Sequence, residues 1–132
     1  MKIVQERPPN FDAILKVFPN AANPGVIFAY GDIIYSPDRA DLPPALISHE
    51  AVHGARQLEF GVELWWDAYL VDLGFRYQEE LLAHRAEYEH LCLLSPSRND
   101  RRFALKQVAK RLASPLYGKM VTLERAMKDI AG

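Results

Sequence analysis

The residues of this chain best suited to catalysis are two histidines and a glutamate with the spacing HExxH: His49, Glu50 and His53. In an α-helix, residues four apart differ by only about 40° around the axis, so both imidazoles lie on one side and can bind one zinc ion. Glu50 lies about 100° around the helix from His49, where its carboxylate can take a proton from a zinc-bound water molecule. The motif therefore predicts one zinc ion per chain, with a bound water whose pKa is lowered to about 7 and which attacks a carbonyl group.

The rest of the zinc coordination must come from another segment, because a catalytic zinc ion usually has three protein ligands and keeps its fourth position for water. The extended motif HExxHxxGxxH would require glycine at position 56 and histidine at position 59. The chain instead has Arg56 and Glu59. The metzincin class of metallopeptidases is thereby excluded.

The segment 77–91 contains acidic residues and histidines that could complete the site. On a helical wheel, Glu80 and His84 lie at the edge of the apolar side, where their side chains can reach into a cleft. Glu87 lies on the same stripe and stays an alternative ligand, whereas Glu79 points away. The wheel alone leaves the choice between Glu80 and Glu87 open.

The HExxH residues are predicted to lie on a helix that begins near a pair of prolines. Pro43 and Pro44 suit the first turn of a helix, where the backbone N–H groups lack partners in any case. A helical wheel of residues 45–58 separates the histidine face from an apolar face, which we expect to pack against the core. The apolar face comprises Ile47, Ala51, Gly54, Ala55 and Leu58.

Other elements are predicted from turn residues and apolar runs. The runs 26–30 and 33–35 flank Gly31 and Asp32, a loop typical of a β-hairpin with a type II′ turn. Further helical segments are expected at 63–73, 76–94, 99–112 and 121–130. The outline is an α+β fold, mostly helical with a small N-terminal sheet, in a single domain over residues 1–132.

Composition and charge exclude several classes of protein. Hydrophobic residues make up 49% and charged residues 25% of the chain, which is typical of globular rather than disordered chains. A formal net charge of -1 provides no overall field that would attract nucleic acid or anionic lipid. The single cysteine, Cys92, cannot form an internal disulfide, and the N-terminal residues lack the apolar run of a secretion signal. We expect a cytoplasmic protein without a membrane segment and without nucleic acid as a partner.

The motifs together resemble those of the gluzincin metallopeptidases, which carry a glutamate ligand in an ExxA-type motif. The resemblance rests on HEAVH at 49–53 and EELLAH at 79–84. The chain looks in particular like the small, single-domain gluzincin-like proteins common in phages and prophages. Supporting stretches are HEAVHGARQ at 49–57, WWDAYL at 65–70, FRYQEELLAHRAEY at 75–88 and SPLYG at 114–118. A zincin-like fold is what this resemblance implies.

Carried over by position, the resemblance implies that His49, His53 and Glu80 bind zinc and that Glu50 is the general base. The implied activity is hydrolysis of an amide bond in a peptide or protein substrate. His84 lies where related families have Asp, Tyr or His one turn after the ligand glutamate. The resemblance therefore implies that His84 contacts a ligand or the substrate.

The substrate-binding residues are less well defined. Peptide substrates of such enzymes commonly lie extended along an edge strand beside the metal, and the hairpin at 26–35 is the candidate strand. Tyr35 and Arg56 are candidates for contact with substrate. The full set of candidates for stabilising the oxyanion is Tyr30, Tyr35, Tyr69, His84 and Arg56.

Two other functions are compatible with the same residues. A zinc-binding structural or interaction module without turnover would share the ligands but would not need Glu50. A helical adaptor would act through the basic segment 98–111, although a solvated helix face explains these charges better. Trp65 and Trp66 could line a cleft, but aromatic residues at helical spacing more often belong to the core. A chain of 132 residues could build only one wall of a substrate cleft, so a partner chain that completes the cleft is a further hypothesis.

Overall fold

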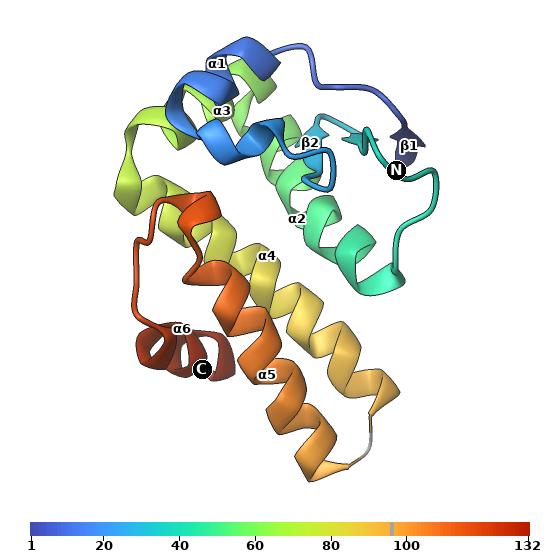
Figure 1. Cartoon of the computed structure of the whole chain (residues 1–132), viewed down its shortest axis with the longest axis vertical. Helices are drawn as coiled ribbons and strands as arrows, with labels where there is room; N and C mark the ends of the chain where they lie inside the picture. The colour runs from blue at the N-terminus through green and yellow to red at the C-terminus, as the bar shows by residue number, and fades with distance from the viewer. Residues whose placement is uncertain (96) are drawn as a thin grey trace.

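The helices and strands are taken from a computed structural model that describes residues 1–95 and 97–132 (Figure 1). Within these residues, a small sheet near the N-terminus is followed by a series of helices, so the predicted α+β class is confirmed. None of the helices there is both long and apolar enough to cross a membrane. In chain order the elements are β1 (Lys2–Val4), α1 (Phe11–Val17), η1 (Pro19–Ala22), β2 (Phe28–Tyr30), β3 (Ile33–Tyr35), α2 (Pro44–Phe60), α3 (Val62–Val71), α4 (Leu73–Leu94), α5 (Arg98–Leu112), η2 (Pro115–Tyr117) and α6 (Leu123–Ala131).

The sheet contains the predicted hairpin and one strand that was not predicted. β2 and β3 pair antiparallel, with Tyr30 opposite Ile33 across the two-residue loop, and Gly31 has the positive φ of 64° that this loop requires. β1 pairs parallel with β3, so the strand order is β1-β3-β2 and β2 is an edge strand. A three-residue strand such as β1 is too short for an alternating pattern to reveal it, and the seven-residue α1 was missed for the same reason.

Prolines and a glycine set the ends of α2. The helix begins at Pro44, with Pro43 in the capping position, as predicted from the first-turn preference of proline. It ends at Phe60, because Gly61 takes a φ of 102° that breaks the helical backbone. Gly61 also caps the start of α3, so the chain reverses sharply between the two helices.

The packing of α2 differs from the prediction, because Gly54 is the one residue of the predicted apolar face that is buried. Leu58 is 63% exposed and Ala55 is exposed too, whereas the face that carries His49 and His53 is buried. α2 lies beside α4, which presents acidic groups to it. Polar side chains can be buried in this way when they pair with one another. The polar face of α2 is therefore the face that packs against α4.

α4 starts three residues earlier than the expected start at residue 76. The carboxylate of Asp72 accepts a hydrogen bond from the backbone N–H of Phe75 and caps the helix. Gly74 therefore lies inside the first turn, although a glycine there indicates a break. The capping bond satisfies a backbone donor that the first turn would otherwise leave free.

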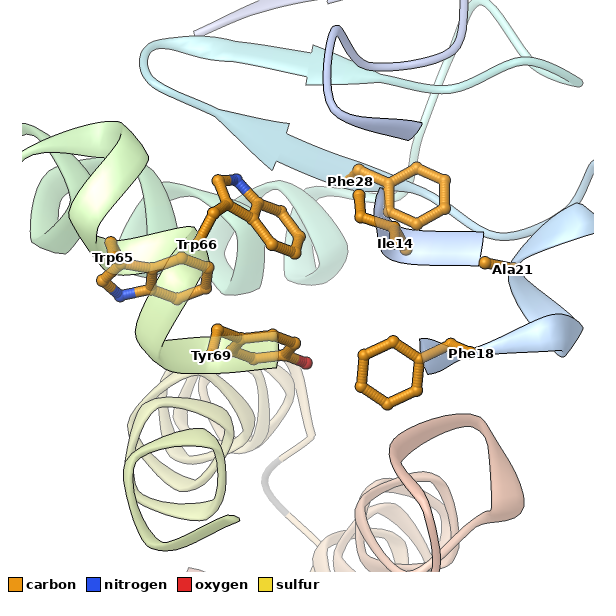
Figure 2. Packing of buried hydrophobic residues seen from close by; sticks show 7 residues of the cluster. All are labelled: Ile14, Phe18, Ala21, Phe28, Trp65, Trp66 and Tyr69. Atoms are coloured by element: carbon orange, nitrogen blue, oxygen red, sulfur yellow. The ribbon is translucent and has the colours of Figure 1, made fainter. Parts of the chain in front are cut away.

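Two apolar clusters flank the region between α2 and α4. The first joins α1, η1, β2 and α3; in Figure 2, Trp65, Trp66 and Tyr69 of α3 lie across from Phe18 and Ile14 of the N-terminal segment. The second joins α4 to α5 and α6. α4 therefore has one apolar side and one polar side, and the polar side faces α2. The aromatic residues of α3 belong to the core, as expected, and they also line a cavity beside α2.

Candidate metal centre

Three buried side chains from two helices converge between α2 and α4. His49 and His53 lie one turn apart on α2, and Glu80 comes from α4; they are 5%, 5% and 3% exposed. His49 Nε2 lies 3.4 Å from one carboxylate oxygen of Glu80, and His53 Nε2 lies 3.1 Å from the other. One ligand atom from each residue lies within 4.8 Å of the others, so the group could hold a metal ion.

The chemistry of this donor set fits a metal ion. Two imidazole nitrogens and one carboxylate are a ligand combination found at catalytic zinc sites, with a fourth position left open. Oε1 of Glu80 is buried and has no hydrogen-bond partner among the described residues. A cation between the three side chains would satisfy this acceptor, which is otherwise costly to bury.

Further hydrogen bonds orient the metal-binding side chains. Nδ1 of His49 lies 3.0 Å from Oε1 of Glu87, and the guanidinium of Arg111 binds Glu87 in turn. Tyr69 donates a 2.6 Å hydrogen bond to Oε2 of Glu80. A carboxylate on the far nitrogen of a ligand histidine fixes its tautomer and ring orientation. Glu87 therefore contacts the back of His49 and does not take the place of Glu80.

The charges of this cluster depend on one another. Burial alone would lower the pKa of His49, but its contacts with Glu80 and Glu87 outweigh burial and raise it to about 10. Burial would raise the pKa of Glu80, but the charge of His53 and the contact with His49 bring it well below its usual range. Burial likewise opposes ionisation of Glu87, yet contacts with His49 and Arg111 lower its pKa. The metal-free cluster thus holds a cationic His49 between two carboxylates.

Glu50 lies in the same cavity but in a different electrostatic environment. Its side chain is buried, and its Oε2 has no hydrogen-bond partner among the described residues. Burial raises the pKa of Glu50, although the nearby His49 and His53 lower it in part. A carboxylate with a raised pKa and a free oxygen is a stronger proton acceptor than an ordinary carboxylate, as a general base requires.

His84 lies against the cluster as a neutral ring. Burial and the charge of His49 lower the pKa of His84 to about 3. Nδ1 of His84 lies 2.6 Å from the carbonyl oxygen of Glu80, and its ring centroid is 4.5 Å from that of His49. Its Nε2 is buried and has no hydrogen-bond partner in the described part of the chain. His84 therefore contacts the ligand His49 and the backbone of Glu80, and it is not among the residues that line the cavity.

A cavity of about 60 Å³ opens beside these residues. On one side lie His49, Glu50, His53 and Glu80, and the opposite walls come from the aromatic cluster, β2 and η2. The predicted edge strand does border the site. However, the side-chain amide of Gln57 already donates to the carbonyl of Ala29 in β2, so this backbone group is not free for pairing with a peptide.

Gln57 and Gly54 hold the hairpin against α2. Gln57 is fully buried, and besides its bond to Ala29 it accepts a 2.7 Å hydrogen bond from the backbone N–H of Gly31. Gly54 lies so close to the hairpin that a Cβ atom there would be 2.5 Å from the carbonyl oxygen of Gly31. Only glycine permits this approach, which brings β2 to the edge of the cavity.

Two of the predicted substrate-contacting residues lie elsewhere. Tyr35 packs against the first apolar cluster and does not line the cavity. Arg56 forms a two-bond ion pair with Glu79, at 3.0 and 2.8 Å. Glu79 points away from the metal-binding group, but it is 2% exposed and also accepts from the indole N–H of Trp65. The guanidinium of Arg56, the buried carboxylate of Glu79 and the indole of Trp65 thus join α2, α4 and α3, although the Arg56 side chain stays 44% exposed.

Sequence reasoning missed three residues of the site: Gln57, Arg111 and Tyr117. Arg111 was grouped with the solvated charges of α5, although its partner Glu87 was already a candidate. Tyr117 lines the cavity, and burial and the charges of Glu80 and Glu50 raise its pKa well above the usual range. The stretch SPLYG that contains Tyr117 was noted only as a supporting motif. Gln57 lies one turn after His53 on the same face of α2, so helical spacing could have found it, whereas no local pattern links Arg111 and Tyr117 to HExxH.

Comparison with known proteins finds no protein-family model, no curated protein and no solved structure that matches the chain. The geometry of the site therefore carries the functional argument.

Proposed function

We propose that the protein is a zinc-dependent hydrolase of amide bonds, of the gluzincin type. The observation that carries the proposal is the convergence of His49, His53 and Glu80 within 4.8 Å, next to the unpaired carboxylate oxygen of Glu50 in one cavity. A purely structural zinc site has four protein ligands and needs no free carboxylate beside it. Three ligands with an adjacent base are the arrangement that hydrolysis requires.

The residues of the chain divide the work of hydrolysis. A zinc ion held by His49, His53 and Glu80 would supply Lewis-acid chemistry, acidifying a water molecule and polarising the carbonyl of the scissile amide. Glu50 takes a proton from the water molecule while the oxygen of the water attacks the carbonyl carbon. Glu50 then returns the proton to the amide nitrogen as the C–N bond breaks, which yields a carboxylic acid and an amine.

Tyr117 is the residue we assign to the developing negative charge on the substrate oxygen. Its raised pKa keeps the phenol protonated, so that it can donate a hydrogen bond in the cavity. Tyr69 is less suitable because its hydroxyl already binds Glu80. Tyr117→Phe should therefore lower kcat while the zinc content stays unchanged.

The walls of the cavity favour a peptide with an apolar side chain next to the scissile bond. Ile14, Phe18, Phe28, Trp66 and Leu116 line it opposite the polar group, and such a surface gains free energy by covering aliphatic or aromatic groups. The substrate that we propose is a peptide or a protein in the cytoplasm. We also propose that the chain is one of the gluzincin-like proteins of phages or prophages.

Zinc content and a single conservative variant test the proposal. Elemental analysis of protein without a polyhistidine tag should find close to one zinc per chain, and less in His49→Ala and Glu80→Ala. Glu50→Gln should keep the zinc and lose hydrolysis of a fluorogenic peptide mixture by a factor of about 10² to 10⁴. Glu59→Gln, an exposed change on the same helix, is the matched control and should behave as the wild type. Folded wild-type protein that takes up no zinc, or full activity in Glu50→Gln, would overturn the proposal.

A second candidate is a zinc-binding module without turnover. The observation in its favour is the closure of the site, where the ligands are 5% exposed or less and the cavity of about 60 Å³ is smaller than a peptide. Under this alternative the wild type binds zinc but cleaves no peptide, and Glu50→Gln matches it in every assay.

A further inference from the structure

A second cavity lies on the other side of Trp66, outside the metal centre. Its volume is about 400 Å³, within the range of roughly 300–1,000 Å³ that small-molecule sites occupy. It lies between the start of α1, the end of β2 and the outer face of α3. Its lining includes Asn10, Tyr30, Glu63, Trp66, Asp67 and Leu70.

Buried polar atoms in this cavity lack partners. Both side-chain atoms of Asn10 and the indole Nε1 of Trp66 are buried without a hydrogen bond to any described residue. Trp66 is only 7% exposed, and its nitrogen lies on the side of the ring away from Tyr69 (Figure 2). Asn10 is in the capping position of α1, yet its side chain makes no capping bond. Two donor groups and one acceptor, which belong to residues that line the cavity, thus have no hydrogen-bond partner among the described residues.

Negative charge lies at the mouth of the same cavity. Glu63 and Asp67 are four residues apart on α3, so both carboxylates lie on one face of the helix. Both residues are exposed, and no basic side chain is present among the described residues that line the cavity. Leu70 and the ring of Tyr30 also line the cavity and provide apolar surface there.

We propose that this cavity binds a lysine residue of a peptide, an amide joined by an aliphatic stem to an ammonium group. Asn10 and Trp66 hydrogen-bond to the amide, the stem covers Leu70 and Tyr30, and the ammonium pairs with Glu63 and Asp67. An amide side chain can donate to and accept from another amide at once, which explains why both atoms of Asn10 are left free. Binding requires no metal ion.

The two tryptophans provide a direct test by NMR. The probe is Nα-acetyl-lysine-N-methylamide, and its neutral match is the norleucine analogue, which has the same amide and stem. The indole N–H signal of Trp66 should shift on titration with the lysine probe, while that of Trp65, already bonded to Glu79, should not. Trp66→Phe assigns the signals. The titration uses metal-free protein, so its result does not depend on the proposed hydrolase activity.

Variants separate the parts of the site. Glu63→Gln and Asp67→Asn should each weaken the lysine probe by about two- to fivefold, as exposed ion pairs do. Asn10→Ala should weaken it by about two- to tenfold, and the exposed change Glu89→Gln on α4 should have no effect. Norleucine binding as tight as lysine binding, no saturation up to about 10 mM, or equal affinity in all variants would each overturn the inference.

Discussion

Gly54→Ala tests how the hairpin is held beside the metal centre. The added Cβ would lie 2.5 Å from the carbonyl oxygen of Gly31 and 2.8 Å from Cε of Met1. Met1 can move its flexible side chain, but the Gly31 carbonyl belongs to the backbone of the hairpin turn. An ordinary contact needs at least about 3.4 Å, so the turn must shift by close to 1 Å. This shift also strains the 2.7 Å bond between the Gly31 N–H and Gln57.

The expected loss of stability follows from opposing terms. Overpacking costs about 1–3 kcal/mol, and weakening the hydrogen bond to Gln57 costs up to about 1 kcal/mol. Alanine recovers about 0.5–1 kcal/mol, because it is the better helix former. The free energy of unfolding should therefore fall by about 1–3 kcal/mol, with an unchanged m-value.

Urea denaturation with a chelator present measures this change, and Gly74→Ala is the matched control. Gly74 also lies in a helix, but it is exposed, and a Cβ there would meet only Asp72 Oδ1 at 3.4 Å. Gly74→Ala should leave stability unchanged or raise it by up to about 1 kcal/mol. A Gly54→Ala protein as stable as Gly74→Ala would refute the close approach of α2 to the hairpin.

Three further predictions concern the metal-binding cluster. Glu87→Ala should weaken zinc binding by about 10- to 100-fold in competition with a chromophoric chelator, even though the pKa of His49 falls; unchanged affinity would contradict the orienting role. Tyr69→Phe should lower the free energy of unfolding by about 1–3 kcal/mol in urea, because the buried Glu80 carboxylate loses a donor; equal stability would show that the bond contributes nothing. The metal-free protein should lose stability between about pH 6.5 and 10, because His49 loses its proton near pH 6.5 in the unfolded chain but keeps it up to about pH 10 in the folded chain. Thermal melts in chelator across this range measure the loss, which zinc should abolish, and a flat profile would argue against a cationic His49.

The metal-binding histidines were predictable because their arrangement is local. His49 and His53 are four residues apart on one helix, and the prolines before them and Gly61 after them set the bounds of that helix. The hairpin turn was predictable for the same reason, since Gly31 meets a φ requirement within a two-residue loop. Each of these features follows from backbone geometry over a few residues.

The role of Glu87 could not be decided from the sequence. Glu80 and Glu87 lie on one stripe of α4, two turns apart, so a helical wheel treats them alike. They differ in what faces them: both histidines meet Glu80, whereas Glu87 meets Nδ1 of His49 and Arg111 from α5. The positions of α2 and α5 along α4 decide this difference.

The buried face of α2 also depended on the tertiary structure. The apolar residues on the side of Leu58 predicted that this side would pack, but Leu58 is 63% exposed, and the histidine face packs against α4 instead. Burying polar groups is favourable only when their partners are in place, and those partners lie on another helix. The amino-acid sequence by itself therefore determined which side chains share a helix face, and the tertiary structure decided which of these faces is buried and against what. The physical reason is that helix periodicity acts over a few residues, whereas charge pairing and hydrogen bonding act between groups that only the folded chain brings together.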